Sequence, residues 1–356
     1  MSTSATSTAL PHHRRRKAVV ILVLLLALPT LLLGSAQAGD ADRSLQVRTL
    51  GACNETAARG VVMAALGTDQ VSGGTLNVSG IPTGATVVEA WLYWNGDDDG
   101  NNVEDDPALF NPTLHDGDPT ITIAGIQAPN PQRVGGPANW VGVRNVYGYA
   151  YRSDVSGIVT GNGSYVVDGM DNFSGEQGYN NGIELVAVYQ RPNTAPTFVG
   201  LGEGLDLIYG SNGPNVGPGS IAPLFRFRSG LDKRQAQVTV FLGGVEPGGQ
   251  TSLWYQTGIN LPPFPQTLRI AGNPEAIEVK NPFDGHHNQN DNGFWDSYTA
   301  AVTVPAGATW LAVQVESKNA QSPQTPAVID WVGAVVQMPL SCTLQVYLPH
   351  LLRSHH

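Results

Sequence analysis

The sequence predicts an all-β protein of the β-sandwich or jelly-roll type, built as two packed lobes. Three observations lead to this prediction. Apolar and polar residues alternate with a period of two in many short segments, as in strands with one buried face. Turn-forming residues separate these segments, with 42 Gly and 25 Pro in the 356-residue chain. Segments with helical periodicity are nearly absent, and charged residues make up only 13% of the chain.

The predicted strands follow one another through the chain after residue 38. In chain order they cover 75–78, 87–94, 120–124, 146–151, 164–167, 183–189, 205–209, 236–242, 298–304, 311–315, 328–336 and 343–348. Between the fourth and fifth of them, Asp154 is expected to cap one short helical turn over Val155–Val159.

The residue patterns distinguish two kinds of predicted strand. Strands 236–242, 298–304 and 311–315 alternate strictly, so we expect each to have one face in solvent. Strands 87–94, 183–189 and 328–336 are apolar on both faces. These three are therefore expected to lie centrally, covered on both sides.

The division into lobes is expected at segment 210–219, which holds four Gly and two Pro in ten residues. We expect an N-terminal lobe over 39–210, a C-terminal lobe over 220–340 and a tail over 341–356. A single hydrophobic core rarely grows beyond about 250–300 residues, which favours two lobes. A long loop within one lobe is the alternative.

The first 38 residues have the three parts of a secretory signal peptide. Arg14–Lys17 form a basic region, Ala18–Leu33 form an apolar run, and Ala36–Ala38 give a small-x-small cleavage pattern. An uncleaved membrane anchor is the alternative, but the run is shorter than the roughly 20 residues that span a bilayer. We expect cleavage after Ala38 and a secreted, extracellular or cell-surface bacterial protein without a membrane span.

The composition and charge exclude several classes of protein. The 7 Trp, 11 Tyr and 9 Phe residues distinguish the chain from a disordered segment. The residues that dominate coiled coils are not enriched. The formal net charge of −10 would repel the phosphate backbone of a nucleic acid, so we expect no nucleic-acid partner.

Two cysteines, Cys53 and Cys342, lie near opposite ends of the segment that follows the predicted signal peptide. In an oxidising compartment, an even pair predicts a disulfide. Two unpaired buried thiols are the alternative. Neither cysteine has a Cys or His neighbour at metal-ligand spacing, which argues against a metal site.

Two loops are candidate calcium sites. In the first, 97–106, the candidate oxygen ligands are Asp97, Asp99, Asn101 and Glu104, although an EF-hand frame is absent. A solvated acidic loop is the alternative. In the second, the offsets resemble a calcium loop, with candidate ligands Asn288, Asn290, Asn292 and Asp296. Plain Asx-rich turns are the alternative there.

Motifs of enzymes are absent from the sequence. There is no nucleophile elbow, zinc-protease motif, phosphate loop or dinucleotide fingerprint, so we expect no catalytic activity. A carboxylate pair for glycoside hydrolysis depends on the fold and not on spacing. Its candidates are Asp116, Asp118, Asp168, Asp171 and Glu184.

Aromatic residues are candidates for stacking on sugar rings. Trp140 and Trp295 lie in Gly- and Asn-rich loops and are the two candidate ligand-binding residues. The aromatic residues of the predicted strands, Trp91 among them, are expected in the core.

Several segments resemble a family of secreted bacterial and archaeal surface domains known as DUF3344. They are Val88–Trp94 (VEAWLYW), 149–165 (YAYRSDVSGIVTGNGSY), 184–192 (ELVAVYQRP) and Asn292–Asp296 (NGFWD). The likeness covers roughly residues 75–335, and it departs from the family pattern at Gln190 and Arg191. It implies an extracellular β-rich module and supplies no catalytic residues. The tail 346–353 is similar to the "VYLPLVLR" ending of many exported proteins of Chloroflexi-type bacteria.

Together these observations predict an exported structural or adhesive binding module, with calcium in its loops and an extracellular polymer or protein as its partner. The alternative is a carbohydrate-active protein, either a lectin-like binder or a jelly-roll hydrolase. Covalent crosslinking between Lys and Asn side chains is a third hypothesis, with only Lys233, Lys280 and Lys318 as candidates after residue 38.

Overall fold

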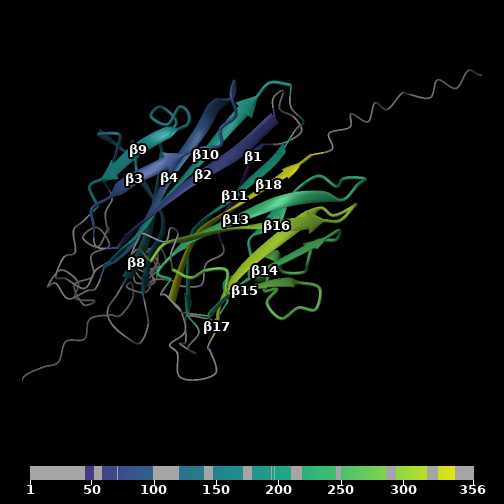
Figure 1. Ribbon diagram of the computed structural model, residues 1–356. Helices are drawn as coiled ribbons and strands as arrows, with labels where there is room; N and C mark the ends of the chain where they lie inside the picture. Colours follow the sequence, from purple (N-terminus) through teal and green to yellow (C-terminus); the bar gives the residue numbers. More distant parts are fainter. Residues whose placement is uncertain are drawn as a thin grey trace, which may run out of the picture. The chain divides into compact units, whose positions relative to one another are not determined.

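The computed structural model describes residues 45–51, 58–69, 71–98, 120–139, 147–170, 179–193, 195, 197–209, 219–245, 250–285, 294–318 and 328–340. All of them belong to one compact unit, Gly39–His356. They form antiparallel strands and one short 3-10 helix, η3 (Pro265–Thr267) (Figure 1). The predicted all-β fold class is confirmed. No helix in the described ranges is long and apolar enough to cross a membrane.

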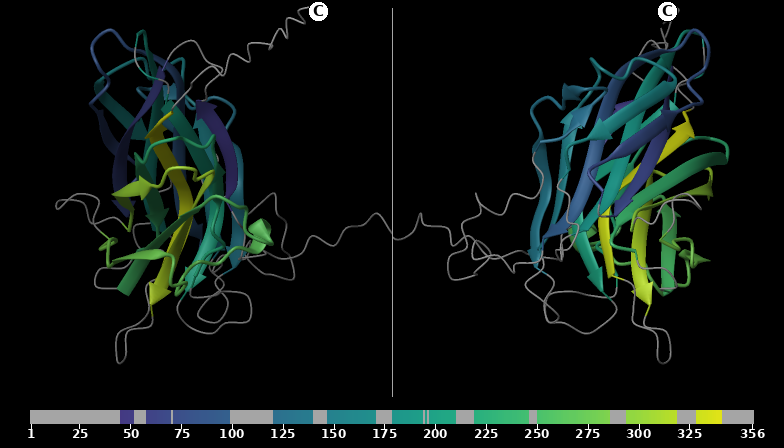
Figure 2. Two further views of the ribbon diagram at one scale, coloured as in Figure 1. Left: turned by 90° about the vertical axis from the view of Figure 1, so that its right-hand side faces the viewer. Right: turned by 60° about the vertical axis from the view of Figure 1, so that its left-hand side comes forward.

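The two larger sheets have five strands each. The strands of the molecule lie in packed layers (Figure 2). Sheet A has the order β1-β11-β18-β13-β16, with bounds Gln46–Gly51, Thr197–Tyr209, Val328–Pro339, Arg234–Gly243 and Asp296–Val304. Sheet B has the order β2-β10-β4-β8-β7, with bounds Ala58–Asp69, Tyr179–Arg191, Thr86–Asp98, Tyr147–Asp154 and Gln132–Asn139.

The two smaller sheets have four strands each. Sheet C has the order β3-β9-β5-β6, with bounds Gly74–Val78, Gly163–Asp168, Thr122–Ile123 and Ile126–Gln127. Sheet D has the order β12-β17-β14-β15, with bounds Leu224–Arg226, Trp310–Lys318, Gln250–Gly258 and Ile277–Lys280.

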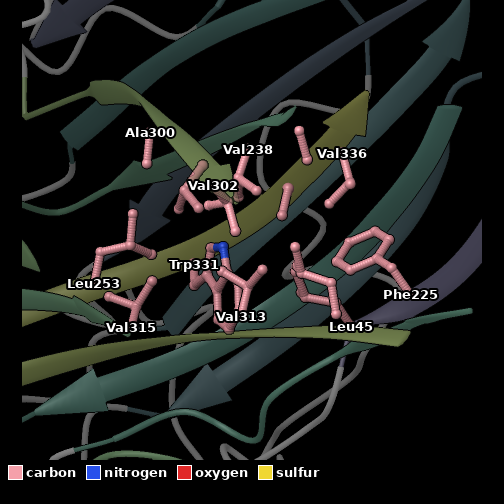
Figure 3. Packing of buried hydrophobic residues seen from close by; sticks show 14 of the residues in the cluster. Leu45, Phe225, Val238, Leu253, Ala300, Val302, Val313, Val315, Trp331 and Val336 are labelled. Atoms are coloured by element: carbon pink, nitrogen blue, oxygen red, sulfur yellow. The ribbon is translucent and has the colours of Figure 1, made fainter. Parts of the chain in front are cut away.

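Three hydrophobic layers hold these sheets in the order C, B, A, D. The layer between C and B includes Leu76 of β3 and Leu92 of β4. The layer between B and A includes Val186 of β10 and Leu201 of β11. Between A and D, side chains such as Trp331 of β18 pack with residues of β13, β16 and β17 (Figure 3). Sheets A and B are therefore each covered by a hydrophobic layer on both faces.

The prediction of central strands is confirmed by β4, β10 and β18. Each lies inside a five-stranded sheet and is buried on both faces. In β10, Ile183 and Leu185 contact the layer toward sheet C, whereas Val186 and Val188 contact the layer toward sheet A. The alternation of strand side chains thus decides which layer each residue joins.

The prediction of a solvent-exposed face is confirmed for β13 and β16 and is wrong for β17. Gln314 of β17 is only 1% exposed, although its side chain is polar. Its Oε1 accepts hydrogen bonds from the backbone N–H groups of Ile270 (2.5 Å) and Ala271 (2.8 Å), and its Nε2 donates to Ser220 O (2.7 Å). Irregular segments cover this face, and they satisfy the amide that would otherwise need water.

The turn expected after Asp154 is present as a single turn. The side chain of Asp154 accepts a hydrogen bond from Ser156 N (3.0 Å), and Val159 N donates to Val155 O (2.9 Å). Residues 210–218, where we expect the lobes to divide, lie outside the described residues, as do the predicted signal peptide and the tail 341–356. Strands β2 to β10 belong to sheets B and C, whereas β11 to β18 belong to sheets A and D, together with β1 in sheet A. The change from one pair of sheets to the other therefore comes before segment 210–218, between β10 and β11. The division into lobes stays a prediction.

Candidate functional site

Glu184 lies in the middle of sheet B and faces sheet A. On β10 it pairs with Ala65 of β2 on one side and with Tyr93 of β4 on the other. The alternation of β10 directs Glu184 to the same face as Val186, and the residue is only 1% exposed. A carboxyl group is therefore buried between two sheets.

The Glu184 carboxyl group is held by two neutral donors. Trp295 Nε1 donates to its Oε2 (3.1 Å), and so does Ser297 Oγ (3.0 Å). The other oxygen, Oε1, is buried and has no hydrogen-bond partner in the described part of the chain. A buried polar atom without a partner is rare and marks a site of interest.

Burial raises the pKa of Glu184 to about 8. Desolvation is the largest cause, the two donated hydrogen bonds oppose it, and the nearby Asp296 carboxyl group adds to it. No described basic side chain is among the groups that shift this pKa. Burial also raises the pKa of Asp296, against hydrogen bonds donated by backbone N–H groups. At neutral pH, Glu184 is therefore mostly protonated.

A groove of about 270 Å³ opens beside Glu184, between sheets A and B. We call it the Glu184 groove. Its polar lining consists of Glu184, Gln237, Thr239, Ser297, Thr299 and Gln337, and its apolar lining consists of Val61, Met63, Ala65 and Val335. The polar residues of β13 and β16 lie on the strand faces that the sequence predicted to be wet. Part of the solvent-exposed face of these two strands therefore lines the Glu184 groove.

Gly182 of β10 makes room for the ring that holds Glu184. A Cβ atom at residue 182 would lie 2.5 Å from the Cβ atom of Trp295 and 2.6 Å from Leu66 O. Both are closer than Cβ atoms approach other atoms, so only glycine lets Trp295 reach Glu184.

A second glutamate, Glu203 of β11, is partly buried between the same two sheets, with 12% of its side chain exposed. Its Oε2 accepts a hydrogen bond from Tyr93 Oη (2.6 Å) and lies 3.5 Å from Arg48 Nη2, while its Oε1 pairs with Arg152 Nη1. The contacts tie β11 and β1 of sheet A to β4 and β8 of sheet B. Burial raises the pKa of Tyr93, so its hydroxyl group stays a donor.

The two arginines also lie over the indole ring of Trp91. The guanidinium carbons of Arg48 and Arg152 are 4.2 and 4.8 Å from the ring centroid. Arg152 further donates from Nη2 to Gln132 Oε1 (2.8 Å). Three partners therefore fix the Arg152 side chain beside the half-buried ring.

Trp91 and Arg152 contribute to a second groove, of about 520 Å³, beside sheet B. We call it the Trp91 groove. Its lining includes Trp91, Asn130, Gln132, Arg152, Asp154 and Ser156. Asp154 Oδ1 accepts hydrogen bonds from the backbone N–H and the hydroxyl group of Ser156. One concave surface thus combines an indole ring with five hydrogen-bonding side chains.

Most of the predicted metal-binding, disulfide and sugar-binding residues lie outside the described part of the chain. These are Asp99, Asn101, Glu104, Asn288, Asn290, Asn292, Cys53, Cys342 and Trp140. Asp97 lies in β4, where its backbone pairs with Gly148 and Tyr179. Within the described ranges, no group of three or more His, Cys, Asp and Glu side chains is arranged to hold a metal ion. The calcium sites and the disulfide stay predictions.

The structure corrects the expectation for Trp295 as a surface residue. It is 0% exposed, and its ring centroid lies 6.3 Å from that of Phe241. A fully buried ring offers no face to a sugar. Asp296 is 5% exposed, and its Oδ2 accepts hydrogen bonds from the backbone N–H groups of Asp284 (2.7 Å) and Gly285 (3.2 Å). This oxygen of Asp296 thus holds the preceding turn.

The candidate carboxylates for glycoside hydrolysis are not brought together where they are described. Asp168 is on β9 in sheet C, and hydrogen bonds from Ser72 and from the backbone of Gly169 hold its pKa below the usual range. Glu184 faces sheet A instead, from sheet B. Asp116, Asp118 and Asp171 lie outside the described residues.

Lys318, one of the three lysines considered for crosslinking to an Asn side chain, forms an ion pair with the Glu278 carboxylate.

The sequence reasoning missed Glu203, Arg48, Arg152 and the role of Trp91. Glu203 lies in a Gly-Leu-Gly-Glu-Gly run that does not read as an alternating strand. A polar residue in an otherwise apolar strand, as with Glu184, is the one signal that was available. Its partners come from strands far away in the sequence, so the pattern of β10 alone does not identify them.

Comparisons with known proteins give no family for this chain. No protein-family profile matches it, and no curated protein matches it significantly. Among solved structures, the major capsid protein P2 of bacteriophage PM2 is 10% identical, with a TM-score of 0.17 over 79% of this chain and 97% of that chain. The VP2 subviral particle of infectious bursal disease virus is 10% identical, with a TM-score of 0.22 over 90% of this chain and 77% of that chain. TM-scores this low carry no argument about function.

Proposed function

We propose that the chain is an exported extracellular or cell-surface module that binds a polymer or protein partner, with the Trp91 groove as its binding surface. The observation that carries this proposal is the lining of that groove, where an indole ring adjoins five hydrogen-bonding side chains in about 520 Å³. Concave sites with an apolar surface and a few convergent polar groups are typical of ligand binding. Export rests on the signal-peptide pattern of residues 1–38.

The chemistry of the Trp91 groove favours a hydroxyl-rich ligand such as a glycan. The exposed amides of Asn130 and Gln132 have both donors and acceptors, which suits hydroxyl groups that donate and accept. Among the described lining residues there is a single carboxylate, Asp154, and it accepts two hydrogen bonds from Ser156. Glycoside hydrolysis uses a pair of carboxyl groups, so the groove supports a glycan binder over a hydrolase.

The test is binding of the purified protein to a panel of soluble and insoluble polysaccharides. We expect Gln132→Ala and Trp91→Phe to weaken binding by about tenfold, the size of one or two lost hydrogen bonds. Gln235→Ala is the matched control, because Gln235 is an exposed glutamine on β13 outside the groove. If both groove variants bind like the control, or if no glycan binds to the folded protein, this function is wrong.

Calcium in loops 97–106 and 288–296 belongs to the same proposal. It is tested by thermal unfolding with calcium and with a chelator. A ligand present at 100 times its dissociation constant adds about 2.7 kcal/mol to the unfolding free energy. We expect the melting temperature to rise by a few degrees with calcium, and an unchanged value would remove calcium from the proposal.

A further inference from the structure

The Glu184 groove is separate from the proposed binding surface and differs from it in charge. It holds a carboxyl group whose Oε1 has no hydrogen-bond partner in the described part of the chain. A second buried acid, Asp296, lies close enough to raise the pKa of Glu184. No described basic side chain contributes to that pKa. Once Glu184 is ionised, the groove therefore carries a negative charge that no described basic side chain of its lining offsets, and this charge is complementary to a cation.

The walls of the groove differ from each other in polarity. Val61, Met63 and Ala65 of β2 give an apolar wall together with Val335 of β18. The strands β13 and β16 contribute the hydroxyl groups of Thr239 and Thr299, whose oxygens are 2.8 Å apart. A ligand that fits both walls has an apolar stem and a positively charged group that donates hydrogen bonds.

Gln337 closes one side of the groove and keeps the two sheets in register there. Its Oε1 accepts a hydrogen bond from the backbone N–H of Val61 (2.6 Å), which joins β18 of sheet A to β2 of sheet B. The groove is therefore a built feature between two fixed walls, with a volume of about 270 Å³. That volume is several times the roughly 30 Å³ that one water molecule takes up in the liquid.

We propose that the Glu184 groove binds a primary ammonium group carried on an alkyl chain, with the ammonium at Glu184 Oε1 and the chain along the β2 wall. An ammonium group has three donors and no acceptor. The Glu184 carboxylate and the hydroxyl oxygens of Ser297 and Thr299 are among the acceptors in the lining of the groove. The methylenes of the stem are buried against Val61 and Met63, as lysine stems are on apolar surfaces.

A divalent metal ion fits the groove less well. Calcium takes six to eight oxygen ligands, several of them carboxylates, at short distances. The groove lining has one carboxyl group, and the described residues contain no cluster of acids and histidines that could hold a metal. An apolar wall contributes nothing to a metal ion, whereas it stabilises an alkyl stem.

Binding of the ammonium group releases a proton. The protonated Glu184 carboxyl group loses its O–H proton to solvent, and the carboxylate then pairs with the ammonium, which keeps its own protons because its pKa is near 10. At pH values below the pKa of Glu184, the affinity for the ammonium group should therefore increase as the pH is raised, by up to about tenfold per pH unit. Asp296 of β16 is the other described acid that acts on Glu184.

The experiment follows the indole N–H of Trp295 by NMR, in the purified protein with ¹⁵N-labelled tryptophan. That N–H donates to Glu184 Oε2, so it reports on the carboxyl group. The probes are n-butylammonium, and Nα-acetyl-lysine methylamide as a lysine side chain on a backbone. n-Butanol is the uncharged control, and calcium and sodium chloride test simple cations.

We expect n-butylammonium to shift the Trp295 signal with a dissociation constant in about the millimolar range, and Glu184→Gln to weaken it at least about tenfold. Ala65→Leu, which fills the groove without changing its charge, should have the same effect. Glu275→Gln, an exposed acid away from the groove, is the matched control and should bind like the wild type. Binding of the lysine derivative would show that a protein side chain can enter, and binding of butylammonium alone would restrict the site to free amines.

Four results would overturn the proposal. They are an unchanged Trp295 signal with both amines, equal binding of n-butanol, equal binding by the Glu184→Gln variant, and a response to calcium alone. The fold of each variant is checked first by its melting temperature, and Ala65→Leu keeps the test valid if Glu184→Gln fails to fold. Because the Trp91 groove is not involved, the proposed function stands or fails separately.

Discussion

Two glutamates lie in the layer between sheets A and B, Glu203 on sheet A and Glu184 on sheet B, and they differ in whether a basic side chain lies beside them. Glu203 is neutralised by Arg48 and Arg152 and accepts a hydrogen bond from Tyr93. Glu184, the cross-strand neighbour of Tyr93, accepts hydrogen bonds from two neutral donors and has no basic partner among the described residues. The ring of Phe241 lies between the rings of Tyr93 and Trp295, with centroid distances of 5.3 and 6.3 Å.

The difference shows two uses of an acid between sheets, one partly buried and one fully buried. A carboxylate that is surrounded by cations and hydrogen-bond donors holds two sheets together, because its removal leaves partly buried cations without their partner. A carboxyl group that lacks a cation is costly to ionise and is kept neutral by its surroundings. The first arrangement contributes to stability, and the second leaves a charge to be supplied from outside.

The largest expected effect is from Glu203→Gln. It leaves Arg48 and Arg152 without their carboxylate and should lower the unfolding free energy by about 3 kcal/mol, measured by chemical denaturation at pH 7. Glu275→Gln, at an exposed acid, should change it by less than about 0.5 kcal/mol. A loss of that small size for Glu203→Gln would mean that the two glutamates do not differ as described.

The next effect is the pH dependence that Glu184 imposes. Its pKa is higher in the folded chain, at about 8, than in the unfolded chain. The folded state thus binds more protons between these values, and stability falls as pH rises through this window. We expect the wild type to lose about 2 kcal/mol relative to Glu184→Gln between pH 6 and pH 8. Parallel curves of unfolding free energy against pH would contradict this.

Asp330 is another buried acid, and it sharpens the comparison because side-chain amides donate to it. Asp330 of β18 accepts hydrogen bonds at Oδ2 from Asn95 Nδ2 (3.1 Å) and Asn181 Nδ2 (3.4 Å) of sheet B. In Gly243→Ala, the new Cβ atom would lie 2.2 Å from Asn95 Oδ1 and displace this network. We expect a loss of about 2 kcal/mol in chemical denaturation, as for other overpacked sites. Unchanged stability would show that the network yields without cost.

The smallest expected effect is from Thr299→Val in the Glu184 groove. The hydroxyl group of Thr299 is exposed and pairs with that of Thr239. Its loss should lower stability by less than about 0.5 kcal/mol, while n-butylammonium binding in the Trp295 NMR experiment weakens by severalfold. A large loss of stability with unchanged binding would make the groove a structural feature only.

The fold class and the central strands could be predicted because they depend on local patterns. Period-two alternation identifies β13 and β16, and apolar faces on both sides identify β4, β10 and β18. The pattern of β17 misled, since Gln314 is buried by irregular segments from 219–223 and 268–271. Residues far away in the sequence determine whether a strand face is covered, so the pattern of the strand itself cannot predict whether that face is buried.

Of the residues around the two glutamates, only Glu184 could be singled out from its own strand pattern. Glu184 is a charged residue in an apolar strand, which marks it from sequence alone. Its donors Trp295 and Ser297 lie more than 100 residues away, and the basic partners of Glu203 come from β1 and β8. The loop position of Trp295 suggested exposure, but Gly182 provides the space that buries it.

The most direct test is a pH titration of the Glu184 carboxyl carbon by ¹³C NMR, with the signal assigned by its absence in Glu184→Gln. We expect an apparent pKa near 8 in the protein alone, and a lower value when n-butylammonium is added, because the ammonium favours the carboxylate. A pKa near the ordinary value of about 4.3 for glutamate, unmoved by the amine, would contradict the account of Glu184 as a buried acid without a cation.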